Sequence, residues 1–465
     1  MFLNLKKINP LQTFGLFFLY SVLISLILQL FVLPVLFPNL GTIDGLISGD
    51  MTLYHNKSVI ISENISQLGW SAWELRPDGF GIVGVVSAIY SFFDIYSPYI
   101  LIPFFSALHA LGALSIMKLI EQLNIEKNIA FISSIPFLIF PSAVLWFAQI
   151  LKDTFTLNGS LIILYGLIRI FGVLKIKEPK DQFKQALFSI LIIIFGFTLV
   201  WLVRPYFVQV TFIFVIFTLF ILNIVLVVSL IKGKIKMPAF FIIWFSQYIL
   251  YIFVQYLPYD SNIAVPIPKG QILTSNTQPL LTSNTQPLLT SNDIEIFSYK
   301  EWESSEFLPH KIDAEFKKLY LQRSYFYQIQ HAANSTIDYG QDLNSVKKII
   351  LYIPRAIQIA FLSPFPSSWL SNHSTVMSNL IHRITGIEMM VVYVFLTGFL
   401  YSLYLWRKKI EFWIMVSFSI YFALLPVYAF PNIGALVRYR YSAIMILVSL
   451  GVSAYMHLYY KKKTK

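Results

Sequence analysis

The chain has 465 residues, of which 57% are hydrophobic and 12% are charged, and its formal net charge is +12. An average soluble domain carries about 25% charged residues, so this composition excludes a soluble globule and predicts an integral membrane protein. The basic residues lie in short clusters between apolar segments, which indicates topology signals and not a nucleic-acid surface. Cysteine is absent, which excludes disulfides and thiolate metal sites.

Apolar segments of about 20 residues recur along the chain, and each is long enough to cross a hydrocarbon core of about 30 Å as a helix. These segments are apolar on every face, so we predict an all-α polytopic fold and not a membrane barrel. The first is too long for a signal-peptide core and lacks a cleavage site, so we expect a retained helix. The ten predicted spans are 13–37, 99–118, 128–147, 154–174, 186–203, 206–231, 237–257, 386–406, 410–430 and 440–459.

Two other apolar segments are not predicted to span the membrane. Segment 79–93 has only 15 residues and is flanked by Asp78 and Asp94, which favours an interfacial helix on the outer face. Segment 346–362 contains three basic residues, each costing about 2.5–3.5 kcal/mol in a hydrocarbon core. We expect it to lie on the outer surface or to pack against the bundle.

The basic clusters then predict the orientation. They occur at the N-terminus, around Lys127, and at 175–184, 232–236, 407–409 and 461–465. With the ten spans above, all of these fall on one side, which the positive-inside rule makes cytoplasmic. The expected location is the plasma or inner membrane, with both termini cytoplasmic.

This topology divides the chain into three parts. Residues 1–257 form an N-terminal transmembrane module with a first outer loop at 38–98, residues 258–385 form a large outer loop, and residues 386–465 form the C-terminal spans. Within the large loop, TSNTQPLL at 274–281 repeats at 282–289 and begins again at 290–292. This polar repeat cannot bury a core, so 274–292 is predicted to be a flexible, dispensable insertion.

Candidate acids follow the first and third spans. The stretch 48–55 puts Asp50 at the outer surface together with Tyr54 and His55, and Lys152-Asp153 precedes the fourth span on the same side. A solvated loop aspartate and an interfacial Lys-Asp pair, with the acid favoured by the helix dipole, are the alternatives.

Candidate cations lie on the outer side against the usual bias. They are Arg204 between two spans, and Arg438 and Arg440 before the last span. Guanidinium groups bind phosphate bidentately, although snorkelling to lipid headgroups would also place arginines there. The histidines show no metal-ligand spacing. The sequence also lacks the phosphate-binding loop of nucleoside triphosphatases and the dinucleotide-binding fingerprint. A divalent metal and the oligomeric state are left open.

These residues, in this order, resemble the GT-C superfamily of membrane glycosyltransferases, which includes protein mannosyltransferases and lipid A aminoarabinose transferases. The resemblance rests on Asp50 with Tyr54, on 76–80 leading into an apolar stretch, on 141–142 with Lys152-Asp153, and on 434–440. The first loop lacks the family's frequent pair of acids, so Asp44 and Asp78 are alternatives to Asp50 as the base.

The resemblance implies transfer of a sugar from a polyprenyl-phosphate-linked donor to an envelope glycan, lipid or protein on the outer face. We accordingly predict Asp50 and Asp153 as catalytic. The predicted substrate-binding residues are Tyr54, His55, Asp78, Lys152, Arg204, Arg438 and Arg440. The expected partners are membrane lipids and that donor, and no nucleic acid. Two alternatives are a polysaccharide polymerase or ligase using a diphosphate-linked oligosaccharide, and a transporter or flippase, which should show paired broken helices or an internal repeat.

Overall fold

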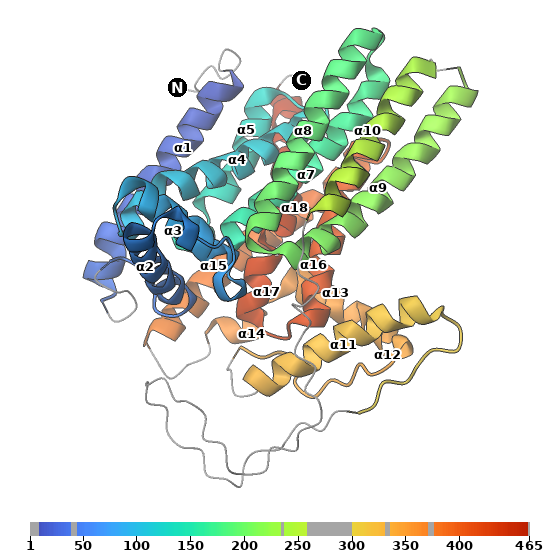
Figure 1. The fold of residues 1–465 in the computed structure, drawn as a ribbon. Helices are drawn as coiled ribbons and strands as arrows, with labels where there is room; N and C mark the ends of the chain where they lie inside the picture. The colour runs from blue at the N-terminus through green and yellow to red at the C-terminus, as the bar shows by residue number, and fades with distance from the viewer. Residues whose placement is uncertain are drawn as a thin grey trace. The chain divides into compact units, whose positions relative to one another are not determined.

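The computed structural model describes residues 9–38, 44–233, 237–257, 300–330, 335–370 and 376–463. Regular structure in these ranges is helical, from α1 (Pro10–Ile27) to α18 (Tyr441–Lys463), with isolated bridges and no strand (Figure 1). The predicted all-α class is thereby confirmed. The insertion predicted at 274–292 lies outside the described residues.

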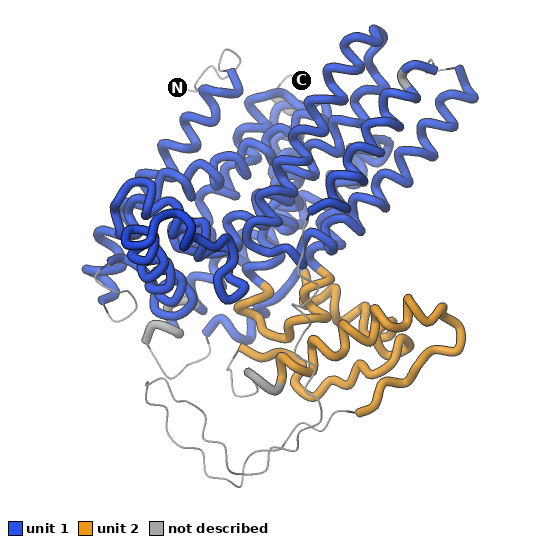
Figure 2. The backbone as a smooth tube through the Cα atoms, in the orientation of Figure 1, with its two compact units in different colours: residues 1–260, 361–423, 437–465 blue, residues 261–360, 424–436 orange. Residues whose placement is uncertain are grey.

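The chain divides into two compact units (Figure 2). Unit 1 comprises 1–260, 361–423 and 437–465, and unit 2 comprises 261–360 and 424–436.

Eight helical segments in the described ranges are long and apolar enough to cross a membrane, so the chain is a multi-pass membrane protein. They are Pro10–Leu36, Pro98–Glu121, Asp153–Lys175, Pro179–Val203, Pro205–Ile231, His382–Trp406, Ile410–Ala429 and Tyr441–Lys461. A ninth predicted span is a pair of helices, α5 (Lys127–Ile139) and α6 (Pro141–Phe147), bent by 69°. The tenth corresponds to α10 (Met237–Tyr256), a shorter apolar helix.

Close helix contacts in unit 1 rest on small residues. Helix α4 (Ile102–Glu121) packs against α1, α5 and α7 (Asp153–Gly172), α7 packs on α8 (Pro179–Val203), and α15 (Val376–Trp406) packs on α18. Gly159 and Gly196 let α7 and α8 approach, since a Cβ on either would lie within 2.8 Å of the other's carbonyl oxygen. Gly451 lets α18 approach α15 still more closely, since a Cβ there would lie 2.0 Å from the Phe395 carbonyl oxygen.

Three loops predicted to be cytoplasmic meet at one end of unit 1. The ammonium of Lys175, after α7, pairs with Glu411 at the start of α16 (Ile410–Ala429). The ammonium of Lys409 donates to the carbonyl of Leu123, after α4. Figure 1 shows the beginning of α1 and the end of α18 at this same end. The structure thus groups these three basic loops at one end, as the charge pattern predicts.

The region predicted as the first outer loop contains two packed helices, α2 (Asp50–Leu68) and α3 (Gly81–Phe93). With 13 residues, α3 is about 20 Å long, too short to cross a membrane, as expected. Helix α2 was not predicted. Its buried serines join it to α3, since Ser58 Oγ donates to the Val83 carbonyl and Ser62 Oγ to the Ser87 carbonyl, both at 3.2 Å.

In unit 2, α11 (His310–Gln330) is held by Arg323, which is 2% exposed. Its Nη1 donates to the Val427 carbonyl at 2.8 Å, and its guanidinium lies over the rings of Tyr327 and Tyr352. The predicted helix at 346–362 is split into α12 (Val346–Leu351) and α13 (Ile353–Leu362), so it is no continuous span. Two further helices belong to unit 1, namely α9 (Pro205–Ile231) and α14 (Pro366–Trp369). The residues of α17 (Ile433–Tyr439) are divided between the two units.

Candidate functional site

The centre of the candidate site is the carboxylate of Asp153, whose side chain is 1% exposed. Arg438 donates to Oδ2 from Nε at 3.1 Å and also from Nη2. Arg204 pairs with Oδ1 through Nη2 at 3.0 Å. One buried carboxylate therefore positions two guanidinium groups from distant parts of the chain.

The local sequence explains each placement. Asp153 is the first residue of α7, where the helix dipole favours a negative charge. Arg204 separates α8 from α9 with φ −142° and ψ 74°, because the residue before a proline is sterically excluded from the helical region. Arg438 lies in the last turn of α17, just before α18 begins.

Aromatic rings surround the cations of this cluster. The Arg204 guanidinium lies 4.9 Å from the centroid of the Tyr439 ring. The Lys152 ammonium lies 4.6 Å from the centroid of Phe80 and 5.1 Å from that of Tyr54. Such contacts stabilise cations that have lost part of their hydration. Arg204 is thus held by both a ring and Asp153, Lys152 by two rings, and Arg438 by Asp153.

Lys152 differs electrostatically from an ordinary lysine. Burial, and then the positive charge of Arg204, lower its pKa to about 8, while Asp50 and Asp153 oppose the shift. Three cations around one buried carboxylate leave an excess of positive charge. The Arg438 side chain is 24% exposed, so part of this charge is accessible from outside the protein. The cluster therefore has the charge and access needed for an anion.

Asp50 lies within electrostatic reach of the same cluster. It is the exposed first residue of α2, after Gly49, whose φ of +119° belongs to the region that favours glycine. Burial raises the pKa of Tyr54, and the charge of Asp50 raises it further. Asp50 also acts on the pKa of Lys152, alongside Asp153 and Arg438. The structure thus puts an exposed carboxylate within electrostatic reach of the cationic cluster.

Three predicted site residues make other contacts. His55 is buried and hydrogen-bonds through Nδ1 with the Tyr90 hydroxyl at 2.9 Å. Asp78 pairs with Lys57 at 2.6 Å, and its side chain is 71% exposed. Arg440, expected beside Arg438, donates to Oγ and to the carbonyl of Ser363. Because α17 ends at Tyr439, the helical direction that carries Arg438 does not continue to Arg440.

Two residues of the cluster were not predicted, namely Phe80 and Tyr439. Both lie inside stretches that carried the family resemblance, and Tyr439 stands between two of the predicted arginines. The signal that could have found them is an aromatic residue adjacent to a cation at the membrane surface, where rings cover cations.

Within the described ranges, no group of three or more His, Asp or Glu side chains is placed to hold a metal ion. Comparison of the chain with family models, with curated proteins and with solved structures finds no match.

Proposed function

We propose that this chain is a membrane glycosyltransferase that transfers a sugar from a polyprenyl-phosphate-linked donor to an envelope glycan, lipid or protein acceptor on the outer face. One observation carries the proposal: Arg204 and Arg438 are fixed on the buried Asp153 beside Lys152, with the exposed Asp50 in electrostatic reach.

The cationic cluster suits the leaving group of this reaction. Transfer breaks the bond between the sugar's anomeric carbon and a phosphate oxygen, and the electron pair stays on the phosphate, which gains one negative charge. Preorganised donors aimed at developing charge are the main source of rate enhancement in many enzymes. Arg438 is the partly exposed guanidinium, so we assign it to the phosphate, with Lys152 as a point charge.

The two aspartates are suited to different roles. Asp153 accepts hydrogen bonds from Arg438 and pairs with Arg204, so its carboxylate serves to hold the arginines. Asp50 is exposed at the start of α2, where an acceptor can approach it. In the proposed reaction Asp50 takes the proton of the acceptor hydroxyl as its oxygen bonds to the anomeric carbon. This assigns Asp50 as the base and Asp153 as the residue that positions the cations.

The membrane character of the chain supports a lipid-linked donor. A polyprenyl chain resides in the hydrocarbon core, and its phosphate resides at the membrane surface. Asp153 and Arg204 lie at the ends of predicted spans, at the start of Asp153–Lys175 and between Pro179–Val203 and Pro205–Ile231. We therefore assign the cations to the membrane surface, where such a phosphate would lie. The stretches that resemble the GT-C superfamily supply Asp50, Lys152, Asp153 and Arg438 to this cluster.

The test uses purified protein in lipid nanodiscs with a panel of radiolabelled polyprenyl-phosphate sugars and a mixed acceptor extract. We expect transfer without nucleotide sugar, and Arg438→Ala should raise the donor KM by about tenfold or more, since a charge-assisted fork is lost. The matched control is Arg407→Ala, an exposed arginine over the Tyr404 ring in a basic loop at the other end.

Three results would contradict the proposal. Turnover with diphosphate-linked oligosaccharides alone would favour a polymerase or ligase. Movement of a lipid-linked sugar across the bilayer without transfer would favour a flippase. An equal effect of Arg438→Ala and Arg407→Ala on the donor KM would show that the cluster does not bind the donor.

A further inference from the structure

Unit 2 contains an open cavity of about 710 Å³, which lies within the usual range of small-molecule sites. Its lining includes Asp338, Gln341, Asp342, Lys348, Leu351 and Arg355. None of these residues belongs to the Asp153 cluster, which lies in unit 1. The cavity is therefore a second candidate site with its own chemistry.

The charged groups of the cavity are paired with one another. Arg355 holds Asp338 bidentately, with Nε donating to Oδ2 at 2.9 Å and Nη2 donating to Oδ1 at 2.8 Å. The Lys348 ammonium pairs with Asp342 Oδ2 at 3.2 Å. Two acids and two bases leave the lining with no formal net charge. This contrasts with the cationic cluster of unit 1 and disfavours an anion such as phosphate.

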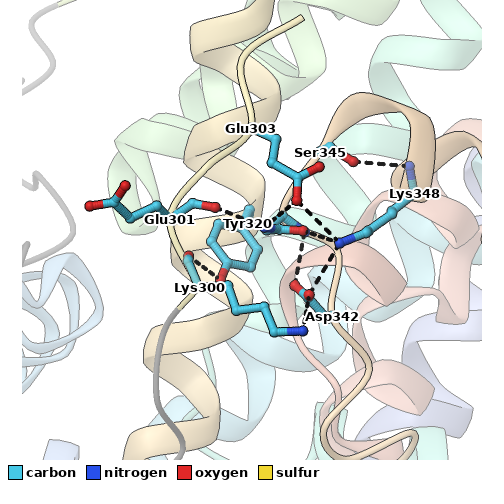
Figure 3. A network of polar contacts seen from close by, with 8 residues as sticks. Lys300, Glu301, Glu303, Tyr320, Asp342, Ser345 and Lys348 are labelled. Carbon is cyan, nitrogen blue, oxygen red and sulfur yellow. Dashed lines mark hydrogen bonds and ion pairs between the residues drawn. The ribbon is translucent and has the colours of Figure 1, made fainter.

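One wall is fixed by a network of polar contacts (Figure 3). The side chains of Asp342 and Glu303 point to the ammonium of Lys348, and Asp342 also pairs with Lys300 at 3.1 Å. Nδ2 of Asn344 donates to the Glu301 carbonyl at 2.7 Å and so holds the segment around Glu301 against this network. The groups that would meet a ligand are thus positioned before it binds.

The part of the lining around Asp338 is also held by hydrogen bonds. The Tyr352 hydroxyl donates to Asp338 Oδ2 at 2.9 Å, and the Tyr327 hydroxyl donates to the Asp338 carbonyl at 2.6 Å. Asp338 and Gly340 have φ of +49° and +75°, so the chain turns sharply between Asp338 and Asp342. Gln341, on the exposed side of this turn, offers an amide donor and acceptor to the cavity.

We propose that this cavity binds a neutral oligosaccharide segment. Sugar hydroxyls are both donors and acceptors, so they suit a site in which carboxylates, an ammonium, a guanidinium and an amide stand close together without net charge. Leu351, which is 69% exposed, offers an apolar surface to the C–H face of a sugar ring. Use of this cavity to hold a glycan acceptor rests on the proposed function, whereas binding itself does not.

The test is saturation-transfer NMR on the full chain in nanodiscs, with neutral trisaccharides of glucose, mannose, galactose and N-acetylglucosamine as probes. Trigalacturonate and the trimer of glucosamine serve as the charged probes. We expect at least one neutral trisaccharide to bind. Gln341→Trp should block the cavity and weaken binding by about tenfold or more, and Gln341→Ala should weaken it less. The control is Lys317→Trp, an exposed position on α11, which should leave binding unchanged.

Binding that survives Gln341→Trp, binding of charged probes only, or no binding by any neutral probe would each overturn the proposal. Donor hydrolysis in the absence of acceptor tests the proposed function separately from saccharide binding in the cavity. If Gln341→Trp abolishes saccharide binding but leaves donor hydrolysis intact, the saccharide site and the proposed function are both supported. If the wild-type protein binds the saccharide but never cleaves a polyprenyl-phosphate sugar, the cavity stands and the proposed function fails.

Discussion

Arg438 and Asp153 are 285 positions apart in the sequence, and Nε of Arg438 donates to Oδ2 of Asp153 at 3.1 Å. This contact joins the last turn of α17 to the first turn of α7, and with Arg204 it forms a buried charge cluster. Buried ion pairs of this kind depend on both partners, because a lone buried charge is strongly unfavourable.

Replacing Asp153 should therefore destabilise the protein. Asp153→Asn keeps the shape but leaves Arg204, which is 6% exposed, without its counter-charge. We expect the free energy of unfolding to fall by about 3–5 kcal/mol. Thermal unfolding in detergent measures this, with Asp78→Asn as the control because the Lys57–Asp78 pair is exposed. Equal unfolding midpoints for the two variants would show that the buried pair does not hold the fold.

Asp50→Asn, unlike Asp153→Asn, should reduce the rate of transfer without reducing stability. Because Asp50 is exposed, its loss should leave the unfolding midpoint unchanged. If Asp50 is the base, transfer should fall by about 100-fold or more. Initial rates for Asp50→Asn, Asp44→Asn and Asp78→Asn, measured side by side, identify the base. A loss confined to Asp44→Asn or Asp78→Asn would move the assignment to that residue.

Donor binding should depend on pH through Lys152, whose pKa is lowered to about 8. Lysine is cationic below its pKa, so the site loses one positive charge as the pH rises through about 8. The donor KM should accordingly increase between about pH 7 and about pH 9. Lys152→Arg stays charged over this range and should flatten the profile. An unchanged rise in KM in that variant would show that another group titrates.

The cysteine-free chain allows a direct test of orientation. Lys408→Cys lies in a basic loop, and Ser48→Cys lies beside the candidate site; both positions are exposed. The positive-inside rule predicts that an impermeant thiol reagent added outside labels Ser48→Cys and not Lys408→Cys. Labelling of Lys408→Cys in intact cells would reverse the topology and place the site on the cytoplasmic side.

Packing of α15 on α18 should be sensitive to one methyl group. A Cβ at Gly451 would lie 2.0 Å from the Phe395 carbonyl oxygen, so Gly451→Ala must push the helices apart. We expect a loss of about 1–3 kcal/mol in stability. Gly15→Ala on α1 is the matched control, because nothing lies within 4 Å of its Cβ. Unfolding midpoints in detergent compare the two, and a tolerated Gly451→Ala would contradict this packing.

The sequence by itself determined the features that depend on local composition. Apolar segments of spanning length predicted the helices, since a backbone in lipid must satisfy its own hydrogen bonds. The basic clusters predicted which loops share an end, and the contacts of Lys175 and Lys409 agree. Asp153, Arg204 and Arg438 were recognised as unusual because charges near a membrane are rare.

Only the tertiary structure decided which of these charges meet. Arg438 reaches Asp153 while Arg440, two residues later, reaches Ser363, because the direction of a side chain depends on where a helix ends and how it packs. The helix α2 was also visible only in the tertiary structure, because its polar sequence lacks the pattern of a spanning helix. Its serines donate hydrogen bonds to backbone carbonyls of α3. The paired charges that line the cavity of unit 2 likewise come from separate segments brought together by folding.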